Sequence, residues 1–245
     1  MAENTQFSAS PQFSYIRSSI DFWKWCIIKL TKTVIFDLDG TLHFTEKALV
    51  PAIQMAMSDL GYRPADPASI NALYGEPLEV FCRKLLKCDD ETCMQFRNGI
   101  RKHQKITLPD RGELYPGTHK MLSDLKEMGF NLVICSNAGL SYIELVTGSL
   151  GIADMFTLLE GRDGQPSKTE RVGSIISSTG SGVTIMVGDR YHDIEAAEEN
   201  SIPSIGCLYG YGRADEMQKA DYGANSPAEI VDIIRKLTTE LQPLP

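Results

Sequence analysis

The sequence predicts an α/β fold, with a parallel β-sheet core and a helical cap domain inserted after the first strand. Apolar, β-branched stretches alternate with helical stretches from residue 131 onward, a pattern typical of βα units joined by right-handed crossovers. Before them, a strand at 33–36 ends in two aspartates and is followed by a long stretch with helical spacing. We therefore expect a Rossmann-like core from residues 31–45 and 112–245, and a helical cap from residues 46–111.

The first strand delivers acidic residues to one edge of this sheet. Residues 33–36 suit a buried central strand, and Asp37, Gly40 and Thr41 supply the polar and turn residues that end it. In open parallel α/β sheets, ligands bind just beyond the carboxyl ends of the strands. Asp37 and Asp39 are therefore expected where such a fold performs its chemistry.

The expected cap is helical throughout. Apolar residues recur at helical spacing within residues 46–62, 77–87 and 90–104. A basic run in and around the last of these helices is expected to be a solvated face rather than a substrate contact. It comprises Arg97, Arg101, Lys102 and His103.

The rest of the core follows from alternating patterns. The predicted strands are residues 131–137, 155–161, 183–189 and 202–210. The predicted helices are residues 139–151, 167–178, 190–201 and 226–241. Because strands and helices alternate, the strands are expected to run parallel.

Composition and charge restrict the class of protein. The chain has 245 residues, of which 42% are hydrophobic, so it can bury a substantial core. Its net charge of -8 argues against nucleic-acid binding through a broad basic face.

The six cysteines form no CxxC pair, which favours neither a zinc site nor a disulfide framework. A reducing, cytoplasmic location is the simplest expectation.

The first thirty residues form a separate segment. The apolar run at 20–30 is shorter than the roughly 20 apolar residues of a membrane-spanning helix, and Asp21, Lys24 and Lys29 interrupt it. No small-residue cleavage site follows it, as a signal peptide would require. We expect residues 1–30 to be an N-terminal extension that packs on the domain; a membrane-surface or partner anchor, and a translation start at Leu30, are the alternatives.

Polar groups at several strand ends are expected to converge on one site. They are Asp37, Asp39, Ser136, Asn137, Asp189 and Asp193, together with Lys168, which opens a helix and can reach in from the side. Carboxylates gathered at one point repel each other by several kcal/mol per close pair at an effective dielectric near 20, so a cation is needed. Oxygen ligands without His or Cys favour Mg²⁺.

This set of groups suits phosphoryl transfer. An aspartate can act as a nucleophile and form an aspartyl-phosphate. A second carboxylate, Asp39, can protonate the leaving alkoxide and later deprotonate the attacking water. Lys168, Ser136 and Asn137 are of the types that offset negative charge on a transferring phosphoryl group.

From about Leu30 onward, the chain resembles the haloacid dehalogenase superfamily of phosphohydrolases. The four motifs that carry the resemblance, in order, are DLDGT at 37–41, ICSN at 134–137, Lys168, and GDRYHD at 188–193. Family members that cleave carbon–halogen or carbon–phosphorus bonds lack an aspartate two residues after the nucleophile. The presence of Asp39 therefore implies a phosphatase or a phosphomutase.

The resemblance also implies a role for each motif residue. Asp37 would be the nucleophile, Asp39 the acid and base, and Ser136 and Lys168 would hold the phosphoryl group. The implied magnesium ligands are Asp37, the backbone carbonyl of Asp39, Asp189 and, in support, Asp193. The residues expected to contact substrate are Thr41, Gly75, Ser136, Asn137 and Lys168.

The cap and the last motif resemble those of phosphoglycolate phosphatases and 5'-nucleotidases. Residues 74–81 are similar to a GxPLxxxF segment of the cap, and residues 188–212 are close to the closing stretch of both groups. Two features depart from the phosphoglycolate pattern. His43, Phe44 and Thr45 replace Val-Asp-Ser, and a KPxP pattern is missing around Lys168. His43 is expected to be an exposed turn residue rather than a contact to the leaving group.

The leading hypothesis is a Mg²⁺-dependent phosphatase that hydrolyses a small phosphorylated metabolite, as phosphoglycolate phosphatases do. The alternatives are a 5'-nucleotidase acting on nucleoside monophosphates, a phosphomutase, and a non-catalytic binding module that keeps the fold. The sequence does not specify an oligomeric state. Intact Asp37, Asp39, Lys168 and Asp189 argue against the non-catalytic module.

Overall fold

The computed structural model describes residues 31–76, 78–162, 164, 166–180 and 182–240. The predictions for residues 1–30 lie outside these described residues. Within them, no helix combines the length and the apolar character needed to cross a lipid bilayer.

The core is a six-stranded parallel sheet in the order β3-β2-β1-β4-β5-β6, so the predicted parallel α/β fold is confirmed. The strands are β1 (Lys32–Phe36), β2 (Phe130–Cys135), β3 (Leu158–Glu160), β4 (Thr184–Gly188), β5 (Ser204–Cys207) and β6 (Tyr222–Ala224). The first strand lies in the middle of the sheet, flanked by β2 and β4, as its apolar sequence predicts.

The register of the central strands aligns their carboxyl ends. Phe36 at the end of β1 pairs with Ile134 of β2 on one side and with Val187 of β4 on the other. The polar residues that follow these three strands therefore leave the sheet at one edge. This edge holds the candidate site.

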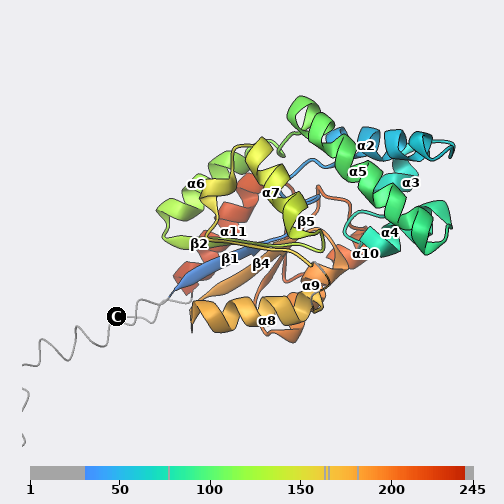
Figure 1. Cartoon of the computed structure of the whole chain (residues 1–245). Coiled ribbons are helices and arrows are strands. Elements are labelled where there is room, and N and C mark those ends of the chain that lie inside the picture. Colours follow the sequence, from blue (N-terminus) through green and yellow to red (C-terminus); the bar gives the residue numbers. More distant parts are fainter. Residues whose placement is uncertain (1–30, 77, 163, 165, 181, 241–245) are drawn as a thin grey trace, which may run out of the picture. The chain divides into compact units, whose positions relative to one another are not determined.

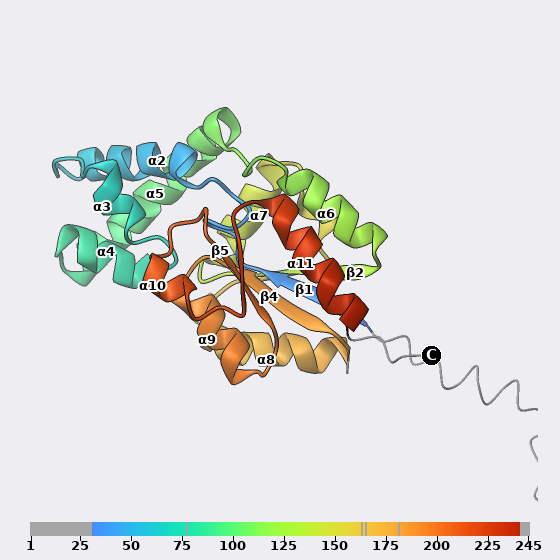
Figure 2. The ribbon, with the colours of Figure 1, turned by 180° about the vertical axis from the view of Figure 1, so that it is seen from behind.

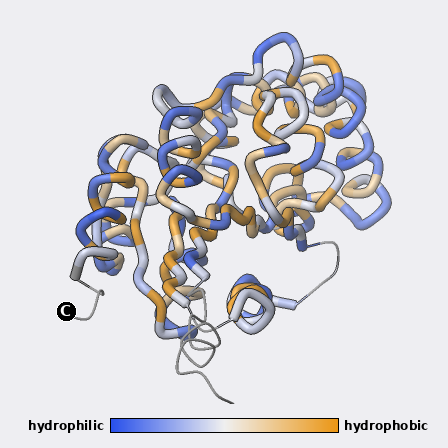
Figure 3. Tube along the Cα trace, turned by 90° about the vertical axis from the view of Figure 1, so that its left-hand side faces the viewer, coloured by the Kyte–Doolittle hydropathy of each residue, from blue (hydrophilic) through white to orange (hydrophobic). Residues whose placement is uncertain are grey.

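Helices cover both faces of the sheet (Figures 1 and 2). They are α6 (Thr118–Glu127), α7 (Leu140–Ser149) and α11 (Pro227–Glu240) on one face, and α8 (Lys168–Thr179) and α9 (Tyr191–Glu199) on the other. Successive residues of a strand point to opposite faces. Accordingly, Val34 and Phe36 pack in the first layer and Ile35 in the second. In Figure 3, orange hydrophobic stretches run through the interior of the tube, and many of its outer turns are blue and hydrophilic.

The segment after the first strand folds into four helices with an apolar cluster of their own. They are α2 (Glu46–Asp59), α3 (Pro67–Asn71), α4 (Leu78–Leu86) and α5 (Asp90–Arg111). Their cluster is built from residues such as Ile53, Phe81, Phe96 and Ile100, and α2 and α5 pack side by side (Figure 1). We keep the name cap for residues 46–111, and its role in covering the site stays a prediction.

Four short elements and one longer helix are absent from the prediction. One of the short elements is the 3-10 helix η1 (Ala153–Met155). The others are α3, the helix α10 (Ala214–Met217), the strand β6 and helix α6. The short elements carry too few residues for a periodic pattern. Helix α6 begins after Gly117, whose φ of +90° lies in the left-handed region that glycine favours, so its start has no Ser, Thr or Asp signal.

Candidate active site

Helix α8 begins at Lys168, and this position places the Lys168 side chain at the edge of the sheet that holds the candidate site. The Ser167 hydroxyl accepts a hydrogen bond from the backbone N–H of Glu170, and the Glu170 carboxylate accepts one from the N–H of Ser167. This capping box fixes the first turn. The buried Lys168 ammonium lies 2.5 Å from Asp37 Oδ1 and 2.5 Å from Asp193 Oδ1.

Three buried carboxylates form a compact cluster at this point. Oxygen atoms of Asp37, Asp189 and Asp193 lie within 4.8 Å of one another. Asp193 Oδ2 accepts a hydrogen bond of 2.9 Å from the backbone N–H of Arg190. Asp189 Oδ2 accepts one of 2.7 Å from the backbone N–H of Tyr211. The backbone thus holds two of the three carboxylates in place.

Burial and mutual repulsion perturb this cluster. Burial, reinforced by the negative charge of Asp193, raises the pKa of Asp37 to about 7 although Lys168 acts in the opposite direction. Burial is also the main cause that raises the pKa of Asp189 well above its usual range. For Lys168, burial acts to lower the pKa, but the charges of Asp193 and Asp37 outweigh it and raise the pKa. The site therefore favours a cation beside its carboxylates.

The loop after β2 is held by a buried arginine that sequence reasoning missed. Arg171 donates to the backbone carbonyl of Ser136 over 2.7 Å and to Asn137 Oδ1 over 2.9 Å. Asn137 in turn donates to the carbonyl of Gly75 in the cap over 3.1 Å. Gly75 adopts a φ of +86°, which suits glycine. Because Arg171 lies three residues after Lys168 on α8, helical spacing was the signal that could have identified it.

Asp39 occupies a second position, beside the carboxylate cluster. Its Oδ1 atom lies 2.7 Å from the Tyr142 hydroxyl, 2.8 Å from the Thr45 hydroxyl and 3.2 Å from Nδ1 of His43. The expectation of an exposed His43 is wrong: the residue is fully buried. A backbone bridge between Asp39 and His43, and a second one from His43 to Leu114, draw the turn inward.

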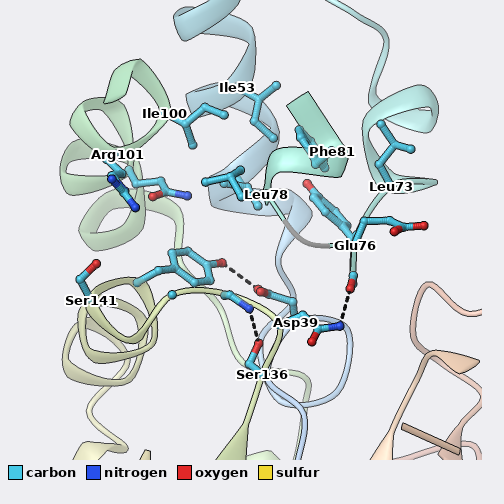
Figure 4. A pocket seen from close by; sticks show the side chains of 18 of the residues that line it. Asp39, Ile53, Leu73, Glu76, Leu78, Phe81, Ile100, Arg101, Ser136 and Ser141 are labelled. Carbon is cyan, nitrogen blue, oxygen red and sulfur yellow. Dashed lines mark hydrogen bonds between the residues drawn. The ribbon is translucent and has the colours of Figure 1, made fainter. Parts of the chain in front are cut away.

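A cavity of about 100 Å³ connects Asp37 and Asp39 with the cap. Ser136, Asn137 and Gly75 also line it. Its remaining wall is largely apolar and includes Ile53, Leu73, Leu78, Phe81 and Ile100 (Figure 4). The cavity therefore offers a polar end for a reacting group and an apolar chamber for the remainder of a ligand.

The structure brings most of the residues predicted from strand ends close together. They form two groups, because some line the cavity and others contact only the carboxylates. Asp37, Asp39, Ser136, Asn137 and Gly75 line the cavity. Lys168 and Thr41 are not among the lining residues. Lys168 contacts Asp37 and Asp193, and the Thr41 hydroxyl lies 3.4 Å from Asp189 Oδ1.

The basic run of α5 divides in the structure. Arg97 pairs with Glu79 at 2.9 Å. Lys102 and His103 both lie near the carboxylate of Asp59, at 3.7 and 2.8 Å. Arg101 differs, because it lines the cavity and has no ion-pair partner among the residues the structure describes.

Comparison with known proteins agrees with this geometry. Residues 34–207 match the model of the haloacid dehalogenase-like hydrolase family. A phosphoglycolate phosphatase of Neisseria gonorrhoeae is 27% identical over 227 residues, which cover 88% of this chain and 95% of that protein. A 5'-nucleotidase of Pseudomonas aeruginosa is 24% identical over 190 residues, which cover 76% of this chain and 86% of that protein.

A solved structure shows the same arrangement of the chain. The crystal structure of a "predicted phosphatase" from Clostridium acetobutylicum superimposes with a TM-score of 0.75 at 28% identity, covering 84% of this chain and 99% of that one. The family match spans the four motifs, from the first strand to β5. The chain therefore belongs to the haloacid dehalogenase-like hydrolase family, and it is a phosphatase that hydrolyses phosphoric monoesters.

Proposed function

We propose that the protein hydrolyses a small phosphomonoester in two steps, through an aspartyl-phosphate on Asp37, with Mg²⁺ as cofactor and phosphoglycolate as the first substrate to test. The observation that carries the proposal is the contact of Lys168 with Asp37 beside two further buried carboxylates, at the polar end of a cavity that also contains Asp39. A nucleophile, a cation and an acid or base are thus within reach of one bound group.

Each chemical role matches one side chain. A carboxylate oxygen of Asp37 attacks phosphorus, and the Lys168 ammonium stabilises negative charge that develops on the phosphoryl oxygens. Ser136 and Asn137 line the cavity beside Asp37 and can donate to the same oxygens. Gly75 lines the cavity from the cap, whereas the Thr41 hydroxyl faces Asp189, so a direct substrate contact by Thr41 is not proposed.

The carboxylate cluster fits a magnesium ion. Three carboxylate oxygens within 4.8 Å of one another repel by about 3 kcal/mol or more per pair at an effective dielectric near 20. Mg²⁺ prefers oxygen ligands of this kind. Asp37 and Asp189, supported by Asp193 and the backbone carbonyl of Asp39, would hold it. Bound Mg²⁺ would withdraw negative charge from the transferring phosphoryl group.

We expect Mg²⁺ to raise the temperature of unfolding more near pH 8 than near pH 5. Burial raises the pKa of Asp37 from 3.8 to about 7, so folding favours its protonated form. The metal-free fold therefore loses stability as the pH rises through this range, whereas metal binding favours the ionised carboxylates. Thermal unfolding in a chelator and in Mg²⁺ at both pH values measures this difference. An equal shift at both pH values would contradict it.

The cavity favours a small leaving group over a nucleoside. Its volume is about 100 Å³, which favours a compact ester. Arg101 lies on its wall without an ion-pair partner in the described part of the chain, so it can attract a carboxylate such as that of glycolate. A 5'-nucleotidase stays the second candidate, because the aromatic rings of Tyr74, Phe81 and Tyr142 on the same wall suit a nucleobase.

We expect Arg101→Gln to raise the KM for phosphoglycolate by about tenfold, as the loss of one charge-assisted hydrogen bond predicts. The KM for a substrate without a carboxylate, such as glycerol phosphate, is expected to change little. Lys105→Gln is the matched control, since it removes an exposed charge from the same helix. Steady-state kinetics on both substrates measures the effect. Equal changes of KM for the two substrates would exclude an anion contact at Arg101.

A panel of phosphate esters tests the proposed function directly. Phosphate release with Mg²⁺ from phosphoglycolate, nucleoside monophosphates and sugar phosphates ranks the substrates. Accumulation of free phosphate without an isomeric product excludes the phosphomutase. Absence of phosphate release from every ester would overturn the proposal.

A further inference from the structure

The carboxyl group of Asp39 is hydrogen-bonded on one oxygen only. Tyr142 from the first turn of α7, His43 from the turn after β1, and Thr45 all contact Oδ1. Oδ2 has no hydrogen-bond partner within the described part of the chain, and Asp39 lines the cavity. Figure 4 shows Asp39 at one end of the cavity, with a dashed line that marks a hydrogen bond to its carboxyl group. The two oxygens of one carboxyl group are therefore not equivalent.

The three contacts differ in what they can donate. Thr45 shares its single hydroxyl proton between Asp39 Oδ1 and the backbone carbonyl of His43, at 2.8 and 3.0 Å. Among the described residues, the Tyr142 hydroxyl donates only to Asp39. His43 is fully buried, and its Nε2 atom has no partner in the described residues, so Nδ1 makes the imidazole's one side-chain hydrogen bond.

An oxygen that already accepts two full hydrogen bonds has no lone pair left for a proton. When Asp39 is neutral, its proton therefore belongs on Oδ2, and Oδ1 remains an acceptor. When Asp39 is ionised, the same donors still fit Oδ1. The contacts hold the carboxyl group in one orientation through both protonation states.

We propose that Tyr142 and His43 are positioning residues that orient Asp39 so that its Oδ2 atom exchanges the proton with the leaving group. This inference rests on the proposed function, because it assigns the acid and base of that reaction to one oxygen atom. Neither residue needs to touch the substrate's reacting atoms to act in this way.

The proton balance of both steps passes through Oδ2. In the first step, the bond between phosphorus and the leaving oxygen breaks, a bond to Asp37 forms, and the proton of Asp39 Oδ2 moves to the leaving oxygen to give the alcohol. In the second step, water attacks phosphorus and gives a proton to Oδ2. The bond to Asp37 breaks, phosphate leaves, and Asp39 is protonated again.

The test compares substrates that differ in their need for an acid. An alkyl phosphate requires protonation of its alkoxide, whereas p-nitrophenyl phosphate leaves as a stable phenolate. We expect Tyr142→Phe to lower kcat/KM for an alkyl phosphate by about tenfold, which is a part of the 10²–10⁴-fold that general acids contribute. For p-nitrophenyl phosphate, we expect kcat/KM to fall by less than about twofold. The parameter kcat/KM reports the step in which the leaving group departs.

Tyr74→Phe is the matched control. It removes a hydroxyl from the same cavity, and that hydroxyl has no hydrogen-bond partner among the described residues. We expect it to change kcat/KM for both substrates by the same factor. If Tyr142→Phe also lowers both equally, the residue acts on structure alone and the inference fails.

Two variants of His43 provide an independent test. His43→Asn keeps a donor near the position of Nδ1, and His43→Leu removes it. The inference expects the selective loss on alkyl phosphates in the leucine variant and its partial rescue in the asparagine variant. If the leucine and asparagine variants discriminate equally between the alkyl phosphate and p-nitrophenyl phosphate, the proposed role of His43 is overturned. A wild-type protein that hydrolyses neither substrate would instead overturn the proposed function itself, so the two failures are distinguishable.

Discussion

Asp37→Asn is expected to lower phosphate release by at least about 10³-fold, as removal of a nucleophile does in other enzymes, while the chain stays folded. Asparagine has the same shape as aspartate but cannot attack phosphorus to form an acyl phosphate. Lys168 keeps its contact with Asp193 at 2.5 Å, so its charge remains paired. A kinetic assay of phosphate release measures the loss.

The same substitution is expected to stabilise the metal-free protein near pH 8. Burial raises the pKa of Asp37 to about 7, so ionising it in the folded state costs free energy that asparagine avoids. Asp124→Asn is the control, because it changes a surface carboxylate whose partner is the exposed Lys120. An Asp37→Asn variant that keeps its activity would contradict the assignment of the nucleophile.

The residues at strand ends were predictable because sheet geometry constrains them. The apolar runs of β1, β2 and β4 were evident from the sequence, and parallel pairing aligns Phe36 with Ile134 and Val187. The residues after each strand must then leave at one edge. Lys168 was expected at the start of a helix from the helical pattern of residues 167–178. The structure shows that a Ser167–Glu170 capping box fixes this start.

The residues that surround Asp39 were not predictable in this way. Tyr142 lies in the first turn of α7, where an aromatic residue at helical spacing indicates core packing and gives no information about its hydroxyl. The sequence around His43 suggested an exposed turn, but the backbone bridges to Asp39 and Leu114 bury it. The Tyr142 contact and the burial of His43 beside Leu114 depend on how separate elements pack, which local sequence patterns do not encode.

The charge balance of the site links its stability to its chemistry. Three buried carboxylates form the cluster, and the Lys168 ammonium contacts two of them, Asp37 and Asp193. Each carboxylate removed from water favours its neutral form. The same excess of negative charge that destabilises the metal-free fold favours the binding of a divalent cation, and this cation together with Lys168 would attract a phosphoryl group. Lys168 is therefore expected to contribute to folding and to catalysis at once.

Lys168→Met is expected to lower the free energy of unfolding near neutral pH by roughly 3–5 kcal/mol, because it leaves Asp37 and Asp193 buried without a positive partner. It is also expected to lower kcat/KM by at least about 10²-fold, because the transition state loses a cation. Urea unfolding in a chelator and phosphate-release kinetics in Mg²⁺ measure the two effects. Lys120→Met is the matched control: its ammonium pairs with Asp124 at 2.7 Å but is exposed, and such pairs contribute about 1 kcal/mol or less.

The pH dependence separates lost charge from lost packing in the Lys168→Met variant. Below the raised pKa of Asp37, which is about 7, this carboxyl group is protonated and no longer needs the ammonium. The loss of stability should therefore be larger near pH 8 than near pH 5. A packing defect would instead be the same at both pH values, since burial of the methionine side chain does not depend on protonation. Only the pH-dependent result is consistent with a lysine whose main task is to offset the charge of the carboxylates that hold metal and phosphate.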